Sequence, residues 1–137
     1  MRTINVGVIG TGWCGGIRAN TCASSALVGE LHIAEVNAER LREVQKETNP
    51  TLATNDYHEL ISNDGIDAIM VSTTPETTHY PIAKESLLAG KHVLLEKPLA
   101  LALDEADELI KLARDRDLKF TVGYSQRFNP KFAYIKK

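Results

Sequence analysis

The sequence contains few cysteines and no long apolar segment. Cys14 and Cys22 are the only cysteines in 137 residues. Two thiols without further Cys or His at ligand spacing form neither a disulfide framework nor a zinc site, so no metal is expected. The longest uninterrupted apolar run, residues 99–103, is far shorter than the roughly 20 residues that a membrane-spanning helix needs. The composition therefore excludes a disulfide-rich secreted domain and a membrane protein.

An excess of charge of one sign is also missing. Sixteen Lys and Arg residues stand against 18 Asp and Glu residues, and they form no basic block. Because a phosphate backbone attracts clustered positive charge, nucleic acid is not expected as a partner. The N-terminal residues lack the apolar core of a signal peptide, which favours a reduced, cytoplasmic protein. With 43% hydrophobic and 25% charged residues, the chain has the composition of one soluble globular domain.

Short apolar runs alternate with helical patterns along the chain. Strands are predicted at residues 4–9, 30–36, 66–72, 92–95 and 120–122, with a weaker candidate at 51–54. Helices are predicted at residues 17–26, 39–48, 56–61, 77–88 and 106–113, and another helix begins in residues 130–137. Strands that are apolar on both faces and alternate with helices are typical of a parallel sheet covered on each side. The predicted fold is therefore a single α/β domain with a doubly wound parallel sheet of the Rossmann type.

Two of the predicted helices carry capping signals. Asp56 precedes Glu59 by three residues, the spacing of a capping box in which the first side chain accepts a helix N–H and the second reaches back. Gly90 follows the helix predicted at 77–88 and suits a left-handed C-terminal cap.

A glycine-rich turn follows the first predicted strand directly. Gly10, Gly12 and Gly15 form a G-x-G-x-x-G pattern between this strand and a helix. In that context the first glycine makes a tight turn, the second allows a pyrophosphate to approach, and the third allows close helix packing. The pyrophosphate would lie on the free N–H groups at the positive end of the helix. The pattern therefore predicts a dinucleotide site.

Thr11, Trp13 and Cys14 occupy the variable positions of this turn and join the candidate cofactor-binding residues. Trp13 has two open roles, since it either lies over the cofactor or substrate cleft or is a partly buried aromatic side chain. Cys14 lies at a helix N-terminus, where a thiol pKa can be depressed, but no base is near in sequence. A small packing residue is therefore the expected role of Cys14.

Glu35 lies 20 residues beyond Gly15, at the end of the second predicted strand. An acid at this spacing accepts hydrogen bonds from the adenosine ribose, whereas a surface carboxylate is the alternative. Because a carboxylate repels a 2′-phosphate, Glu35 favours NAD over NADP. Arg40 would argue against this preference for NAD if its side chain turned toward a phosphate; the alternative is that Arg40 is a solvated helix residue.

Two further segments follow strands at the sheet edge where α/β proteins bind ligands. Residues 72–79 are dense in hydroxyl groups, and residues 96–98 read Glu-Lys-Pro. Alone, His79 would be a capping or packing residue, and Glu96 with Lys97 a surface ion pair. Together, VSTTPETTHYPIAKESLLAGKHVLLEKPLA, the upstream VGVIGTGWCGG and the downstream GYSQRFNPKF resemble the nucleotide-binding domain of the Gfo/Idh/MocA family, the glucose-fructose oxidoreductase and inositol dehydrogenase group.

The resemblance, which covers essentially the whole chain, implies an NAD(P)-dependent oxidoreductase acting on a sugar, inositol or related polyol. In the family, the Lys of E-K-P touches the reacting hydroxyl and moves its proton while hydride goes to the nicotinamide, so Lys97 is the implied catalytic residue. Glu96 is expected to hold Lys97 in place. Besides the glycine turn and Glu35, the implied cofactor-binding positions are Thr73, Thr74, Pro75, His79, Glu96, Lys97 and, from the R-F-x-P segment, Arg127.

The chain departs from the family in two places. Ala102 stands where relatives usually cap a helix with Ser or Thr, so Asp104 is expected to cap instead, at a loss of at most about 1 kcal/mol. Residues 1–123 are assigned to the dinucleotide-binding domain and residues 124–137 to the start of a segment that leads to the family's C-terminal α/β substrate domain, which is absent here. We therefore expect a fragment of a longer enzyme that is inactive alone.

Alternative functions and assemblies stay open. A stand-alone NAD-binding module without turnover is the main alternative, and a methyltransferase using S-adenosylmethionine leaves the tripeptide 96–98 unexplained. The expected partner is a small sugar or polyol, with no nucleic acid and no membrane. Apolar side chains after residue 120 predict a homo-oligomer if they stay uncovered, or a monomer if the tail folds back.

Overall fold

The apolar runs form six short strands in a computed structural model of the protein, which describes residues 3–135. All neighbouring strands are parallel, and their order is β3-β2-β1-β4-β5-β6. The strands are β1 (Ile4–Ile9), β2 (Val28–Ala34), β3 (Leu52–Thr54), β4 (Ala68–Val71), β5 (His92–Leu95) and β6 (Phe120–Val122). This order is that of a doubly wound nucleotide-binding sheet, with the direction of winding reversing between β1 and β4. The predicted fold class is confirmed.

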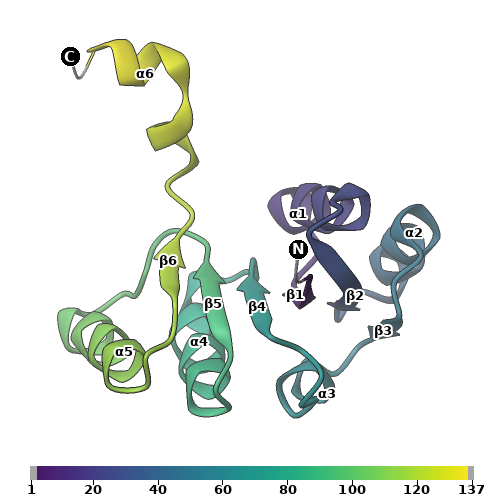
Figure 1. Ribbon diagram of the computed structural model, residues 1–137, viewed down its shortest axis with the longest axis horizontal. Helices are drawn as coiled ribbons and strands as arrows, with labels where there is room; N and C mark the ends of the chain where they lie inside the picture. The colour runs from purple at the N-terminus through teal and green to yellow at the C-terminus, as the bar shows by residue number, and fades with distance from the viewer. Residues whose placement is uncertain (1–2, 136–137) are drawn as a thin grey trace.

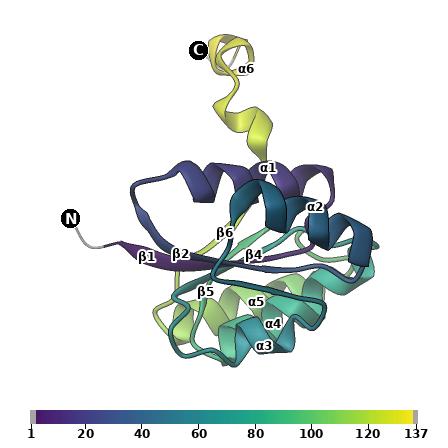
Figure 2. The ribbon, with the colours of Figure 1, turned by 90° about the vertical axis from the view of Figure 1, so that its right-hand side faces the viewer.

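Helices cover both faces of the sheet (Figures 1 and 2). One layer contains α1 (Trp13–Ser24) and α2 (Ala38–Thr48), and the other contains α3 (His58–Ile61), α4 (His79–Leu88) and α5 (Leu103–Asp115). Two short turns, η1 (Glu76–Thr78) and η2 (Ser125–Phe128), and a last helix, α6 (Pro130–Ile135), complete the described chain. No helix within residues 3–135 is both long enough and apolar enough to cross a bilayer.

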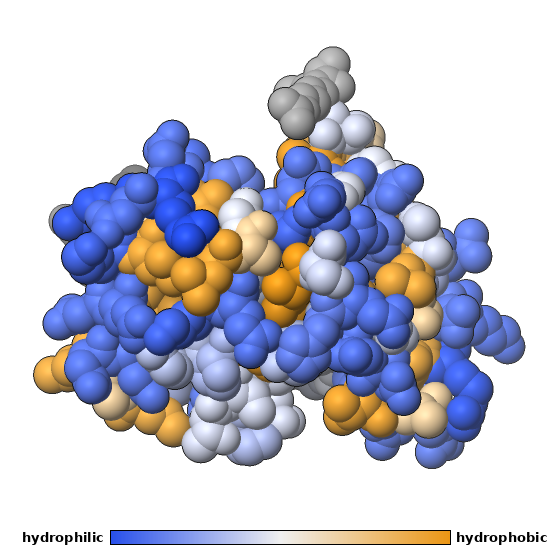
Figure 3. Space-filling view, turned by 90° about the horizontal axis from the view of Figure 1, so that it is seen from below, coloured by the Kyte–Doolittle hydropathy of each residue, from blue (hydrophilic) through white to orange (hydrophobic). Residues whose placement is uncertain are grey.

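Each layer of helices encloses its own apolar core. Val8 and Ile33 belong to the cluster beneath α1 and α2, whereas Ile69 and Leu95 belong to the cluster facing α4 and α5. All four side chains are fully buried. On the surface seen in Figure 3, hydrophobic side chains form separate patches within mostly hydrophilic surroundings. The sheet is therefore buried between two separate apolar cores.

The ends of several elements differ from the predictions. α1 begins at Trp13 rather than at residue 17, because Gly12 already serves as its N-cap and accepts the N–H of Gly16. β2 begins at Val28 because Val28 pairs with Ile4 of β1. The helix predicted at 77–88 is divided into η1 and α4, and Gly90 behind it adopts the predicted left-handed conformation (φ 77°).

Neither predicted N-terminal cap forms. Asp56 accepts the N–H of His58 (3.0 Å), but Glu59 accepts the Thr54 hydroxyl (3.0 Å) instead of reaching back to Asp56. Asp104 does not cap α5, because the helix already begins at Leu103 with Ala102 as its N-cap. Asp104 therefore lies inside the first turn.

The segment after β6 leaves the sheet and stands away from the other elements (Figure 1). Its large apolar side chains are exposed, with Phe128 at 84% and Tyr134 at 80% of their full surface. The helix predicted over 130–137 is observed to residue 135, and Lys136 and Lys137 lie outside the described residues. The tail does not fold back onto its own sheet, so its predicted self-association stays a prediction.

Candidate functional site

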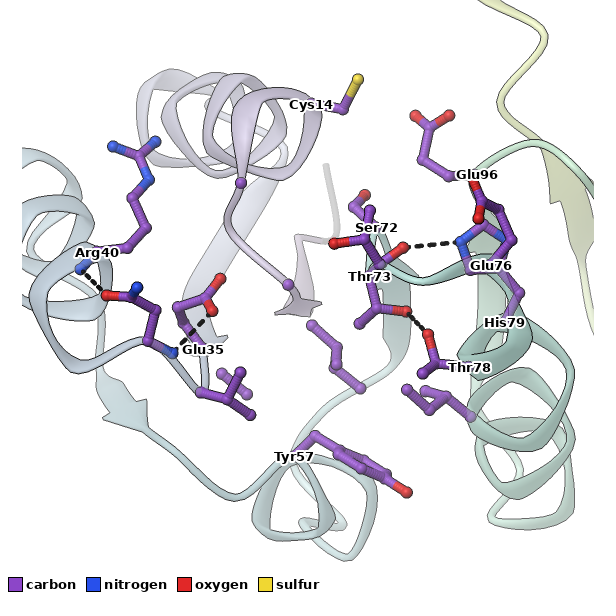
Figure 4. A pocket seen from close by; sticks show the side chains of 18 of the residues that line it. Cys14, Glu35, Arg40, Tyr57, Ser72, Thr73, Glu76, Thr78, His79 and Glu96 are labelled. Carbon is purple, nitrogen blue, oxygen red and sulfur yellow. Dashed lines mark hydrogen bonds between the residues drawn. The ribbon is translucent and has the colours of Figure 1, made fainter.

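An open pocket of about 710 Å³ lies at the carboxyl ends of the strands. Its walls come from the turn after β1 and from the segments after β2, β4 and β5. In Figure 4, Glu35 and Arg40 lie on one side of this pocket, and Ser72, Thr73 and Glu96 lie on the other. The position between β1 and β4 is the crevice in which doubly wound sheets bind ligands. Within residues 3–135, no group of three or more His, Cys, Asp or Glu side chains is arranged to hold a metal ion.

The three glycines of the turn differ in what their surroundings require at each position. Gly10 has a positive φ of 81°, in the left-handed region that favours glycine. A Cβ on Gly15 would lie 1.8 Å from the Gly10 carbonyl oxygen, so α1 packs against the turn only without a side chain there. A Cβ on Gly12 would meet nothing within 4 Å. Among the described residues, no contact therefore requires a glycine at position 12, and the space beside it is open to the pocket.

Thr11 is held by residues from two other elements. Its N–H (2.7 Å) and its hydroxyl (3.1 Å) both donate to Oε2 of Glu35, at the end of β2. Its carbonyl oxygen accepts Nε of Arg40, on α2, at 2.7 Å. Thr11 is fully buried. All polar groups of this residue are therefore engaged, and the glycine turn is fixed in place without a ligand.

Glu35 and Arg40 consequently have structural partners besides any ligand. Oε1 of Glu35 also accepts the N–H of Asn37 at 3.0 Å, which leaves this oxygen one acceptor position. The half-buried Arg40 also donates to Glu43 at 3.0 Å, so it is not a freely solvated residue. Both side chains still line the pocket.

The N-terminus of α1 opens into the same pocket. Within the described residues, no side chain accepts a hydrogen bond from the first turn of this helix, and the turn contains no acidic residue. Its N–H groups and its positive end are therefore available to an anion. Trp13 is 82% exposed and Cys14 is exposed. Of the two roles open for Trp13, the partly buried aromatic is therefore not found, and the expectation that Cys14 is a small packing residue is wrong.

The loop after β4 forms part of the opposite wall. The hydroxyls of Thr73 and Thr78 are hydrogen-bonded to each other at 2.6 Å, and Thr74 and Pro75 are exposed. The Oγ atom of Ser72 is buried without a hydrogen-bond partner among the described residues. An unpaired buried hydroxyl is costly, and this one lies in the lining of the pocket.

His79 is buried between two loops. Its Nδ1 lies 2.9 Å from the carbonyl oxygen of Pro98, and its Nε2 lies 2.9 Å from that of Thr73. The ring therefore joins the loop after β4 to the segment after β5. Because both nitrogens face backbone carbonyls, His79 shapes the pocket wall but has no free nitrogen for a ligand.

Glu96 and Lys97 both line the pocket but do not pair with each other as expected. Oε1 of Glu96 accepts both Nε (3.1 Å) and Nη2 of Arg18, and its Oε2 accepts the backbone N–H of Lys97 at 3.2 Å. The expectation that Glu96 holds the ammonium group is wrong, since the guanidinium of Arg18 takes its place. Lys97 is exposed, and no hydrogen bond or ion pair of its Nζ is found in the described part of the chain.

Arg18 was not among the predicted site residues, and Arg127 lies outside the pocket. Arg18 lies four residues after Cys14, on the same face of α1, and that spacing was the available signal. Arg127 belongs to η2 and lines a separate hollow beside Phe120 and Phe128, not the pocket. The tail stands away from the sheet, so Arg127 is carried away from the other predicted site residues.

Comparison with known proteins agrees with the fold described above. The model of the family described as "Oxidoreductase family, NAD-binding Rossmann fold" matches residues 4–124. Among curated proteins, the chain is 36% identical over 138 aligned residues to UDP-N-acetylglucosamine 3-dehydrogenase of Acidithiobacillus ferrooxidans, covering all of this chain and 41% of that protein.

Two solved structures are also similar. The scyllo-inositol dehydrogenase of Lactobacillus casei, with bound NAD(H) and scyllo-inositol, has 27% identity and a TM-score of 0.89 over 98% of this chain and 40% of its own. A 3-ketoreductase from Actinomadura kijaniata, in complex with NADP and TDP-benzene, has 28% identity and a TM-score of 0.86 over 98% of this chain and 41% of its own. The chain thus spans about two fifths of the length of these relatives. It belongs to the Gfo/Idh/MocA oxidoreductase family and has the NAD-binding Rossmann fold of that family.

Proposed function

We propose that this chain binds NAD and supplies Lys97 to the oxidation of a sugar or polyol hydroxyl. The observation that carries the proposal is the open face of Gly12, a glycine that no contact within the protein requires, at the uncapped N-terminus of α1. The unpartnered hydroxyl of Ser72 lines the same pocket. A dinucleotide fits these features, because its pyrophosphate takes N–H groups at a helix terminus.

The two sides of the pocket suit the two ends of the cofactor. Glu35 retains an acceptor position for a ribose hydroxyl at the β2 side. Glu96, Lys97 and the loop held by His79 form the other wall, where the nicotinamide is assigned. A nicotinamide held between these walls would supply the hydride acceptor for the substrate carbon. Lys97 then acts as the general base: with Nζ in its neutral form, the amine takes the proton that leaves the hydroxyl oxygen.

Preference for NAD over NADP rests on the charges near Glu35. Arg40 is engaged by Thr11 and Glu43, and Val36 beside Glu35 is an exposed apolar residue in the lining. A 2′-phosphate would meet a carboxylate, and the guanidinium nearby already donates to Thr11 and Glu43. Two like charges about 4 Å apart repel by about 1 kcal/mol even in water, which corresponds to about fivefold in affinity.

Calorimetric titration of the chain with NADH and NADPH tests the proposal. We expect NADH to bind at least about fivefold more tightly, and Glu35→Gln to narrow the difference. Glutamine is the matched variant toward Thr11, because its carbonyl oxygen still accepts both hydrogen bonds from that residue, whereas its NH2 group loses the bond from the Asn37 N–H. Trp13, the only tryptophan, is exposed in the pocket lining, so quenching of its emission by NADH gives a second readout. Absence of NADH binding, or equal affinities in the unmutated chain, contradicts the proposal.

Turnover separates the proposed enzyme part from a module that only holds the cofactor. The similar proteins are more than twice as long as this chain, and rate depends on a positioned substrate and excluded water. We therefore expect the chain alone to bind NAD without detectable NADH production from sugars or inositols. Joined to the remainder of a full-length relative, the chain is expected to regain turnover, and Lys97→Met to remove it.

A further inference from the structure

Arg18 and Glu96 join the two halves of the sheet across the pocket edge. Arg18 lies on α1, which connects β1 to β2, whereas Glu96 follows β5 in the other half. Both Nε and Nη2 of Arg18 donate to Oε1 of Glu96. The two side chains are only 21% and 14% exposed. Their ion pair is thus shielded from water more than an ordinary surface pair is.

The backbone after β6 covers this pair. A Cβ on Gly123 would lie 2.6 Å from Nη2 of Arg18 and 3.1 Å from Oε1 of Glu96. The N–H of Gly123 donates to the carbonyl of Leu95 at 2.7 Å, which fixes its distance from β5. Three segments far apart in the sequence therefore enclose one guanidinium and one carboxylate, and a side chain at position 123 would displace the guanidinium.

The pair determines which partners Glu96 has left. Oε1 is occupied by Arg18, and Oε2 accepts the backbone N–H of Lys97 at 3.2 Å. The carboxylate therefore already lies over Lys97, yet no bond between it and Nζ of Lys97 is found within residues 3–135. A carboxylate beside an ammonium group favours the charged form of the amine, and a charged amine accepts no proton.

We propose that Arg18 is a positioning residue that keeps Glu96 away from the amine of Lys97. The guanidinium offers two donors in a rigid fork that matches a carboxylate, so it competes well for Glu96. Lys97 is then left with an unpaired amine at the pocket. The part of this inference that concerns a reaction rests on the proposed function, whereas the pairing itself does not.

The reactivity of the Lys97 amine in the cofactor-free chain tests the pairing. Acylation by an N-hydroxysuccinimide ester is followed at Lys97 by peptide mass spectrometry, with the exposed Lys46 on α2 as internal reference. In Arg18→Met the freed carboxylate turns to Nζ, and acylation of Lys97 slows by about two- to fivefold, the effect of a partly exposed ion pair. In Arg18→Met/Glu96→Gln the rate returns to that of the unmutated chain, and Arg18→Lys keeps it close to that value.

Two results overturn the inference. One is an unchanged Lys97 rate in Arg18→Met, and the other is a double variant that stays as slow as the single one, since the effect then comes from altered packing and not from the carboxylate. Glu96→Gln alone is a further check: its rate should equal that of the unmutated chain, and a faster rate would mean that Glu96 pairs with Lys97. No cofactor is present in this assay, so failure of NADH binding in the titration remains a separate result.

Discussion

Replacing Gly12 by alanine should weaken cofactor binding without destabilising the fold. The φ of Gly12 is −58° and a Cβ there meets no atom within 4 Å. Alanine at an N-cap lowers the free energy of unfolding by about 0.5–1 kcal/mol relative to glycine. Alanine also restricts the unfolded chain, which raises the free energy of unfolding by about 0.4–1 kcal/mol. The two terms nearly cancel, and we expect the melting temperature to change by less than about 3 °C.

The added methyl group would nevertheless occupy the space assigned to the pyrophosphate. Overfilling a close-packed contact costs about 1–3 kcal/mol, so the affinity for NADH is expected to fall by about 5- to 150-fold. Gly15→Ala is the matched control at the other end of the turn. Its Cβ would lie 1.8 Å from the backbone oxygen of Gly10, so we expect a loss of stability of about 1–3 kcal/mol.

Scanning fluorimetry and calorimetric titration of both variants separate stability from binding. The reasoning predicts a stable Gly12→Ala protein that binds NADH poorly and a Gly15→Ala protein with a lower melting temperature. If Gly12→Ala binds NADH like the unmutated chain, the open face of Gly12 is not where the cofactor approaches. If Gly12→Ala melts as early as Gly15→Ala, the distinction between the two glycines is wrong.

Three further predictions concern reactivity, pH and association. Cys14 is exposed in the pocket lining, whereas burial raises the pKa of the Cys22 thiol. A thiol reagent should therefore modify Cys14 alone in the native chain, and bound NADH should slow this modification. Peptide mapping measures the extent of modification at each cysteine. Glu108 raises the pKa of Lys84 to about 12, and Lys84 lowers that of Glu108. The pair thus stabilises the fold at pH values above the ordinary pKa of a carboxyl group and below the ordinary pKa of a lysine. The small difference in melting temperature between the unmutated chain and Lys84→Met should therefore disappear as the pH falls below the range in which Glu108 ionises. Self-association through the exposed tail should be seen by light scattering and lost in a chain ending at residue 123; a monomer at all concentrations would contradict it.

The fold could be predicted because its signals are local. The strand runs, the glycine turn and Gly90 each depend on residues that are neighbours in sequence, and the structure bears them out. The errors at the ends of α1 and β2 arise because pairing with β1 and the N-cap at Gly12, not local preference, determine where these elements begin.

The contacts of the site could be predicted only in part. Spacing indicated that Glu35 lies beside the glycine turn, but nothing in the pattern shows that its carboxylate binds Thr11. Arg18 and Glu96 are 78 positions apart, and no periodicity connects a helix residue to a loop on the other half of the sheet. Periodicity tells which face of an element is buried, whereas the partner of a polar side chain depends on the packed structure.

The parallel sheet also determines how the molecule can be handled. All strands run in the same direction, so their carboxyl ends lie together on the pocket side of the sheet. Ile4 therefore enters β1 on the side remote from the pocket, whereas the chain leaves Val122 on the pocket side. An affinity tag or a sensor surface attached ahead of β1 therefore leaves the cleft accessible. In a chain shortened to end just after Val122, the same attachment lies on the pocket side of the sheet, and binding measured on a chip should differ between the two points of attachment.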